Sequence, residues 1–263
     1  MTLTHSMNRS VTIQASPETV FRFFTDSARW SAWWGAGSSI DPRPGGTIYI
    51  RHPNGVENTG EVLEIAPPQR ILFSYGYPGG KPFGPEESRV TIRLAPQGAA
   101  THLSLHHEFA AEGPRDQFIQ GWRYQLSVFS NVVADEVHAG AEGKVDAWFG
   151  LWSIADDTER GAVITKIAAP AITFRDRYSM LAGHEDLRTH IGASQRFMPG
   201  LKMERRGATR HCQGTVLAEW AAVGADGAER MSGTNVFVFG PDGKMESVTG
   251  VQQFPNRDRG ASQ

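Results

Sequence analysis

The 263-residue sequence predicts an α+β protein of two domains. Two series of short strand-like runs, each divided by turn residues, predict the sheets, and amphipathic segments beside each series predict the helices. The length agrees, because domains typically have roughly 100–200 residues. Apolar residues make up 40% of the chain, which is enough to build ordinary hydrophobic cores.

Charge and cysteine content exclude several classes of protein. The formal net charge is −2 and no basic run is longer than Arg205-Arg206, which argues against a nucleic-acid partner. The single cysteine, Cys212, permits no intrachain disulfide and fits a reducing compartment. No signal peptide or apolar stretch of membrane-spanning length occurs. We therefore expect a cytoplasmic protein without a membrane partner.

The first elements form a strand and two short helices. The strand is expected at 9–15, and Ser16-Pro17 supplies an N-cap and a first-turn proline for a helix. A second cap at Asp26-Ser27 predicts a short helix in which Trp30, Trp33 and Trp34 fall at positions i, i+3 and i+4. The three tryptophans therefore share one helical face.

Five strand-like runs and a long helix complete the first half. The runs lie at 47–52, 59–65, 70–77, 88–94 and 101–109, with turn clusters such as 42–46 between them, and predict an antiparallel meander. The helix is expected over 118–137, where apolar residues recur every three or four positions. Its apolar stripe must pack on the sheet.

These elements resemble a known superfamily. The segments ASPETVFRFFTDSARWSAWWG, PRPGG, GEVLEIAPPQRILFSY and the Gly121-Trp122 pair, in this order, are similar to the SRPBCC or START-like superfamily. Within it, the branch named after the activator of the heat-shock-protein-ninety ATPase (AHSA-type) is most similar, from about Arg9 to His138. The resemblance implies a helix-grip fold, in which a curved sheet wraps the long helix around a deep apolar cavity.

Ligand-binding candidates in this half follow from strand alternation and from the implied cavity. In 101–109, alternation places His107 on the same face as Leu103, Leu105 and Phe109, which should be the inner face. The alternative, which the sequence alone favours, is that His107 is a satisfied semi-buried residue and that the tryptophans pack the core. The full set of candidates is Trp33, Trp34, Arg51, Tyr75, His107 and Trp122.

The second half begins after the small, polar stretch 138–144. We expect domains at 1–140 and 141–254 and a flexible tail at 255–263. Helices are expected from Val145, at 158–167 and at 183–200, with a strand at 172–176 between the last two. Four strand-like segments follow, and Asp226-Gly227 and Asp242-Gly243 predict hairpin turns between the last three.

The second half resembles another superfamily. The segments WFGLWSIADD, ITFRDRYSMLAG, GHEDLRTHIGASQRFMPG, GTVLAEWAAVGADG and GTNVFVFGPDGKMESVTG are similar to the SnoaL-like branch of the nuclear-transport-factor-2-like superfamily. The resemblance implies a cone of bent sheet and three helices around a pocket. Related members include polyketide cyclases, ketosteroid isomerases and epoxide hydrolases. A homodimer through this domain is implied, because related cones often associate through their sheets.

Asp176 is the catalytic candidate of the second half, because it aligns with the general base of ketosteroid isomerases. A tyrosine on the first helix of those enzymes is replaced by Trp148 or Trp152, and an indole is the poorer acid. His190 is a second candidate that could face the pocket, and Trp220 would line it. The alternatives are a carboxylate that caps nearby backbone and a surface histidine.

Three functions stay open at this stage. The first is proton-transfer chemistry of the isomerase or polyketide-cyclase type on a hydrophobic small molecule, and the second is non-catalytic binding of such a ligand. The third is a co-chaperone, which is the least favoured because a second pocket domain stands where eukaryotic activators have a chaperone-binding domain. We expect no metal and no cofactor, because no zinc motif, Walker loop or dinucleotide fingerprint occurs.

Overall fold

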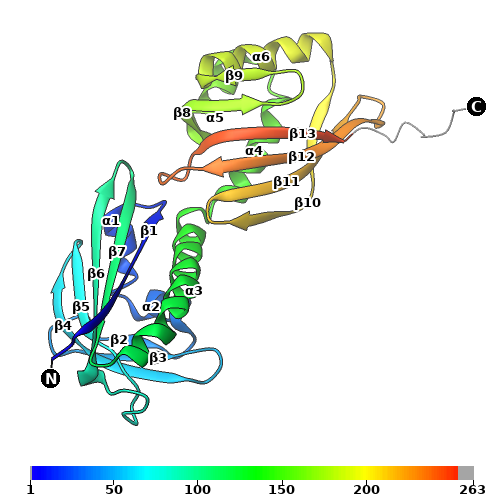
Figure 1. Ribbon diagram of the computed structural model, residues 1–263. Helices are drawn as coiled ribbons and strands as arrows, with labels where there is room; N and C mark the ends of the chain where they lie inside the picture. Colours follow the sequence, from blue (N-terminus) through cyan, green and yellow to red (C-terminus); the bar gives the residue numbers. More distant parts are fainter. Residues whose placement is uncertain (1, 254–263) are drawn as a thin grey trace, which may run out of the picture. The chain divides into compact units, whose positions relative to one another are not determined.

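The computed structural model describes residues 2–253, which form two compact units (Figure 1). The units are Met1–Glu136 and Val137–Gln263. The mixed α+β class predicted from the sequence is confirmed, with antiparallel sheets and a long helix. The predicted boundary between residues 140 and 141 falls just beyond this division and stays a prediction. The predicted tail at 255–263 lies outside the described residues.

Unit 1 contains one seven-stranded antiparallel sheet with the order β1-β7-β6-β5-β4-β3-β2. Burial alternates along its strands, as in β7, where Leu103, Leu105 and His107 face inward and His102, Ser104 and His106 face outward. The strands are β1 (His5–Ile13), β2 (Ser39–Ile40), β3 (Thr47–Arg51), β4 (Glu57–Ala66), β5 (Arg70–Ser74), β6 (Ser88–Gln97) and β7 (Ala100–Phe109).

Two short helices and one long helix cover the inner face of this sheet (Figure 1). They are α1 (Pro17–Arg22), α2 (Ser27–Trp34) and α3 (Glu112–Val137), and a short 3₁₀ turn, η1 (Pro85–Glu87), precedes β6. The predicted caps are present: Ser16 accepts from Thr19 N and Asp26 accepts from Arg29 N. The shared face of α2 turns inward, so Trp30, Trp33 and Trp34 are 0%, 3% and 3% exposed.

Unit 2 contains a six-stranded sheet with the order β10-β11-β12-β13-β8-β9. All neighbours are antiparallel except β13 and β8, which run parallel. The strands are β8 (Ala168–Arg175), β9 (Met180–Ala182), β10 (Lys202–Cys212), β11 (Thr215–Val223), β12 (Glu229–Phe239) and β13 (Met245–Gln253). Tight turns containing Gly227 and Gly243, both at positive φ, join the last three strands as the sequence predicts.

Three helices, α4 (Ala141–Leu151), α5 (Asp157–Ile167) and α6 (Gly183–Phe197), pack on one face of this sheet (Figure 1). The expectation that the first of them begins at Val145 is wrong. It begins at Ala141, because Ala141 is itself buried and Lys144 reaches the carbonyl oxygen of Gly243. Among residues 2–253, no helix is long and apolar enough to cross a membrane.

Candidate functional site

Unit 1 contains a largely aromatic cavity of about 320 Å³, which we call the first cavity. This volume lies at the lower end of the range of small-molecule sites. The cavity lies between the C-terminal end of α2, the turn after β3, the end of β5 and the N-terminal half of α3. It is lined by Trp34, His52, Pro53, Asn54, Tyr75, Phe118, Gly121, Trp122, Tyr124 and Gln125.

The residues predicted to line this cavity divide into two groups. Trp34, Tyr75 and Trp122 do line it. Trp33 packs in the core instead, against Phe24 and Phe129. The expectation for Arg51 is wrong, because Arg51 lies on the exposed face of β3, whereas its neighbour Ile50 points inward.

His107 lies behind the cavity wall rather than in it. It is 0% exposed, and Trp122 Nε1 donates a hydrogen bond to its Nδ1 at 2.9 Å. The proton of the neutral ring must therefore sit on Nε2, which lies 3.0 Å from Ser88 Oγ, and Ser88 in turn donates to the Tyr75 carbonyl. Burial, with a smaller effect of His106, lowers the pKa of His107 well below its usual value. His107 thus holds Trp122 in place as a neutral hydrogen-bonding group.

A second polar group, His52-Asn58-Tyr75, lies at the edge of the first cavity. Asn58 Oδ1 accepts from Tyr75 OH at 2.8 Å and lies 3.0 Å from His52 Nε2. Burial raises the pKa of Tyr75 well above its usual value, so its phenol acts as a neutral donor. Sequence analysis missed His52 and Asn58. Strand alternation could have identified Asn58, because it lies on the same inward face of β4 as Val62.

Unit 2 contains a second cavity of about 250 Å³. Its wall is mostly aromatic and methionine-rich, but polar groups from β8, α6 and β12 also reach it. It is lined by Trp152, Phe174, Asp176, Tyr178, Ser179, His190, Ser194, Met198, Leu201, Met203, Trp220, Ala222, Met231, Asn235, Gly250 and Gln252.

Asp176 and His190, the two catalytic candidates, both line this cavity. Asp176 is partly exposed and follows the last residue of β8; its Oδ1 accepts from Tyr178 N at 2.8 Å, and its Oδ2 has no hydrogen-bond partner within residues 2–253. His190 Nε2 lies 3.3 Å from Ser179 Oγ, and its ring contacts those of Trp152 and Phe174. The turn after β8 and helix α6 therefore bring the two candidates to one cavity.

Asn235 is the polar residue of the second cavity that sequence analysis missed. The residue is 3% exposed and its amide makes no hydrogen bond within residues 2–253, but neither amide atom is among the buried unpaired atoms, so the amide stays accessible at the cavity wall. A Cβ placed on Gly250 of the neighbouring strand would lie 3.2 Å from Asn235 Oδ1 and 3.3 Å from Asp176 Cβ, so the two side chains flank the same glycine. Strand alternation could have identified it, because Asn235 lies on the same buried face of β12 as Phe237 and Phe239.

The three tryptophans predicted for the second cavity behave differently. Trp152 and Trp220 line it, and the indole nitrogens of both are buried without a hydrogen-bond partner. The expectation for Trp148 is wrong, because it is 0% exposed and packs in the core against Phe174 and Phe237. Trp148 lies on the inner stripe of α4, whereas Trp152 lies just after its last turn.

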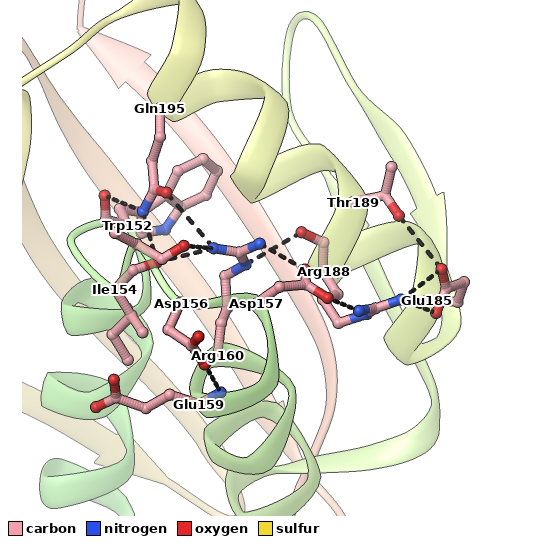
Figure 2. A network of polar contacts seen from close by, with 11 residues as sticks. Trp152, Ile154, Asp156, Asp157, Glu159, Arg160, Glu185, Arg188, Thr189 and Gln195 are labelled. Carbon is pink, nitrogen blue, oxygen red and sulfur yellow. Dashed lines mark hydrogen bonds and ion pairs between the residues drawn. The ribbon is translucent and has the colours of Figure 1, made fainter.

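A buried arginine fixes the segment that carries Trp152 (Figure 2). Arg160 is 3% exposed; it donates to the Ile154 and Arg188 carbonyls and binds Asp157 Oδ1 at 2.7 Å. Gln195 donates to the Trp152 carbonyl at 3.1 Å. A guanidinium with five fixed donors suits this junction of α4, α5 and α6, because a buried charge must be fully hydrogen-bonded.

Within residues 2–253, no group of three or more His, Cys, Asp or Glu side chains is arranged to hold a metal ion.

Comparison with known proteins finds a family model and solved structures that are similar to part of the chain. The family model described as "Activator of Hsp90 ATPase homolog 1-like protein" matches residues 14–134, under half of the chain. Among solved structures, a putative isomerase of the SnoaL-like family from Agrobacterium tumefaciens has 18% identity and a TM-score of 0.42, over 45% of this chain and 99% of that chain.

Two further solved structures are similar to about half of the chain. CalU16 from Micromonospora echinospora has 26% identity and a TM-score of 0.40, over 48% of this chain and 75% of that chain. The Aha1 dimer from Colwellia psychrerythraea has 19% identity and a TM-score of 0.42, over 47% of this chain and 91% of that chain. No curated protein matches the chain.

Proposed function

We propose that the protein binds apolar small molecules in both cavities and that the second cavity catalyses proton transfer next to a ketone. The reaction would be an isomerisation or a polyketide-cyclase-like step without metal or cofactor. The observation that supports this most is that Asp176, His190 and Asn235 line one apolar cavity. Polar groups that converge in an apolar cavity are the usual form of such a site.

In this proposal Asp176 is the general base. Tyr178 N holds one carboxylate oxygen, which leaves the other to accept the proton from the carbon next to the ketone. The electron pair of the broken C–H bond moves into the carbonyl, and the enolate oxygen needs a hydrogen-bond donor. The amide of Asn235, which lines the cavity on the other side of Gly250 and has no partner within residues 2–253, can supply that donor.

His190 has a supporting role in the same scheme. Ser179 Oγ and the rings of Trp152 and Phe174 hold its imidazole at the cavity wall. We infer that it orients the substrate or a water molecule rather than abstracting the first proton. Trp152 and Trp220 would enclose the apolar part of the substrate.

Non-catalytic ligand binding is the second candidate function. It is favoured by the aromatic and methionine-rich wall of the second cavity, because such a wall adapts to apolar ligands. A co-chaperone role rests only on the name of the family model that matches residues 14–134. It stays the least favoured alternative.

The test replaces Asp176 with Asn and measures exchange of the α-protons of 2-tetralone, an enolisable bicyclic ketone, in D₂O by NMR. Asp176→Asn keeps the shape and the bond from Tyr178 N but removes the basicity. Catalysed exchange should fall by about 10²–10⁴, the usual contribution of general acid–base catalysis.

Asp242→Asn is the matched control. Asp242 Oδ1 accepts from the backbone N–H two residues later, at 2.9 Å, as Asp176 Oδ1 does, but Asp242 does not line the cavity. Exchange should be unchanged in this variant. Full exchange activity in Asp176→Asn, or equal losses in both variants, would leave non-catalytic binding as the better proposal.

A further inference from the structure

His52 offers a chemical group that the proposed proton transfer does not use. It opens the turn between β3 and β4, where its N–H donates to the Val56 carbonyl at 2.8 Å. Its ring meets Trp34 edge to face, with the centroids 5.5 Å apart. The backbone is placed by Gly35, where a Cβ would collide with the Arg51 carbonyl oxygen. His52 is therefore fixed beside the first cavity by both its main chain and its ring.

The hydrogen bonds of Asn58 determine which nitrogen of His52 carries the proton. Asn58 Nδ2 donates to the Gly76 carbonyl at 3.2 Å, so the other atom of the amide is the acceptor Oδ1. Oδ1 faces His52 Nε2 at 3.0 Å, and an oxygen acceptor requires a proton on that nitrogen. The neutral ring then carries its lone pair on Nδ1.

Nδ1 of His52 has no hydrogen-bond partner within residues 2–253 and is not among the buried unpaired atoms. It is thus accessible from the first cavity, whose wall includes His52. Burial lowers the pKa of His52, which keeps the ring neutral near pH 7 and the lone pair available.

The residues around Nδ1 determine which kind of ligand could bind there. Trp34, Phe118 and Trp122 line the same cavity and favour a planar aromatic ligand. A ketone or a carboxylate would present only acceptors to Nδ1, and two acceptors repel each other. A hydroxyl group supplies the donor that Nδ1 lacks.

We propose that the first cavity binds an aromatic alcohol, whose hydroxyl group donates a hydrogen bond to His52 Nδ1 while its rings lie among Trp34, Phe118 and Trp122. The inference rests on the proposed ligand binding in the first cavity. It does not depend on the chemistry of Asp176. The two cavities would then select opposite ligands, a hydroxyl donor in the first and a carbonyl acceptor in the second.

The experiment compares 2-naphthol with 2-methoxynaphthalene, which has the same rings but no hydroxyl donor. Calorimetry on the full chain should show that 2-naphthol binds about five- to tenfold more tightly, the usual net value of one hydrogen bond. Hydrogen exchange should locate the bound probe, with protection over residues 47–60 and in the first half of α3. In His52→Leu the two probes should bind with about equal affinity.

His102→Leu is the matched control, because His102 is an exposed histidine on the outer face of β7. The preference should persist in this variant. If both probes bind with equal affinity to the wild type, or if His52→Leu keeps the preference, the inference is wrong while ligand binding stands. If neither probe binds unit 1, ligand binding in the first cavity fails with it.

A pH series tests the same point without a mutation, in case His52→Leu does not fold. Protonation of Nδ1 removes the acceptor, so the preference should disappear as the pH falls below the usual range of histidine. Two other titratable groups lie beside the cavity: Tyr75, whose pKa burial raises, and His107, whose pKa burial lowers and which accepts a hydrogen bond from Trp122. Because the preference is a ratio of two affinities, a change at Trp122 that weakens both probes alike does not alter it. A preference that stays constant down to about pH 5, with the near-ultraviolet circular dichroism unchanged, would overturn the proposal.

Discussion

The two cavities use their polar groups in opposite ways. In the first cavity, Tyr75 and Asn58 bond to each other, Trp122 bonds to His107, and Gln125 donates to the Trp33 carbonyl. In the second cavity, the amide of Asn235 and the indole nitrogens of Trp152 and Trp220 lack partners among the described residues. In the first wall, Trp34 Nε1 and His52 Nδ1 are the exceptions without a partner among the described residues, while the second wall keeps more groups open.

This difference has an energetic meaning. Burying a polar group without a partner costs about 1–3 kcal/mol, so a fold that leaves the indole nitrogens of Trp152 and Trp220 unpartnered gives up stability at those positions. Such a cost is expected where the missing partner is a ligand or a transition state. The satisfied wall of the first cavity instead favours recognition by shape and by the single acceptor of His52.

Asn235→Leu should have the largest effect on this comparison. If the amide stabilises the enolate, catalysed exchange of the 2-tetralone α-protons should fall by about 10²–10³, the usual loss on removing one oxyanion donor. The free energy of unfolding should stay about constant, because the variant loses no hydrogen bond within residues 2–253. Loss of activity without loss of stability is the result that distinguishes a functional residue from a packing residue.

Thr234→Val is the control for this variant. Thr234 precedes Asn235 on β12 and has the opposite strand parity, so its side chain does not line the cavity. It should keep full exchange activity. If Asn235→Leu is fully active, or if it unfolds more easily than the wild type, the proposed contrast between the cavities is wrong.

His107→Gln should alter the pH dependence of unit 1 alone. The folded-state pKa of His107 lies below its unfolded value of about 6.5, so its contribution to stability is complete above that pH and is lost as the pH falls toward the folded pKa. Across this window one excluded proton is worth up to about 1.4 kcal/mol per pH unit. In His107→Gln, the free energy of unfolding should therefore fall less steeply on acidification than in the wild type. The contribution of His52, whose pKa is also lowered, should remain.

Hydrogen exchange by mass spectrometry can separate the two units in this experiment. After correction for intrinsic exchange rates, peptides from β7 and α3 should lose protection on acidification in the wild type and less so in His107→Gln. Peptides from β12 serve as the internal control, and His102→Gln is the control variant. If His107→Gln loses protection on acidification as steeply as the wild type, another group governs the acid sensitivity of unit 1.

Much of the fold was predictable because it follows from local signals. The caps at Ser16 and Asp26, the shared face of the tryptophans and the hairpin turns at Gly227 and Gly243 all depend on residues close in sequence. The start of α4 was not predictable in this way, because Lys144 in its first turn donates to the carbonyl of Gly243, about one hundred positions away in the sequence.

The candidate sites were predicted less completely, for a related reason. Strand parity located His107 on the inner face but could not show that Trp122 occupies its cavity side. It would have located Asn58 and Asn235 had a polar residue on a buried face been treated as a signal. Arg51 was placed in a cavity as a candidate of the implied fold, but it lies on the exposed face of β3. Trp148 was placed there because it replaces the tyrosine of the related isomerases, but it packs in the core against Phe174 and Phe237, which are distant in sequence.

The outer faces of the two sheets extend the comparison. The outer face of unit 1 carries Arg93, His102 and Ser104, whereas that of unit 2 carries Leu217, Val236 and Val251. Val238 and Val251 are 37% and 56% exposed. The exposed Arg210–Glu219 ion pair lies beside these apolar residues. An apolar patch with a polar rim is typical of an interaction surface. We propose that two copies of the chain associate through it.

Val236→Lys tests this association and should have the smallest effect on the cavities. Val236 lies opposite Leu217 on β11 and Thr249 on β13, at the centre of the outer face, so a lysine there would place two like charges against each other in a symmetric dimer. Light scattering should show a dimer for the wild type and a monomer for the variant. Ser104→Lys, on the outer face of unit 1, should leave the dimer intact. Exchange activity on 2-tetralone should change less than about twofold, because a residue with the opposite parity to Asn235 does not reach the cavity. A wild-type monomer would remove the proposed interface, and a large loss of activity in the variant would show that the second cavity depends on the partner copy.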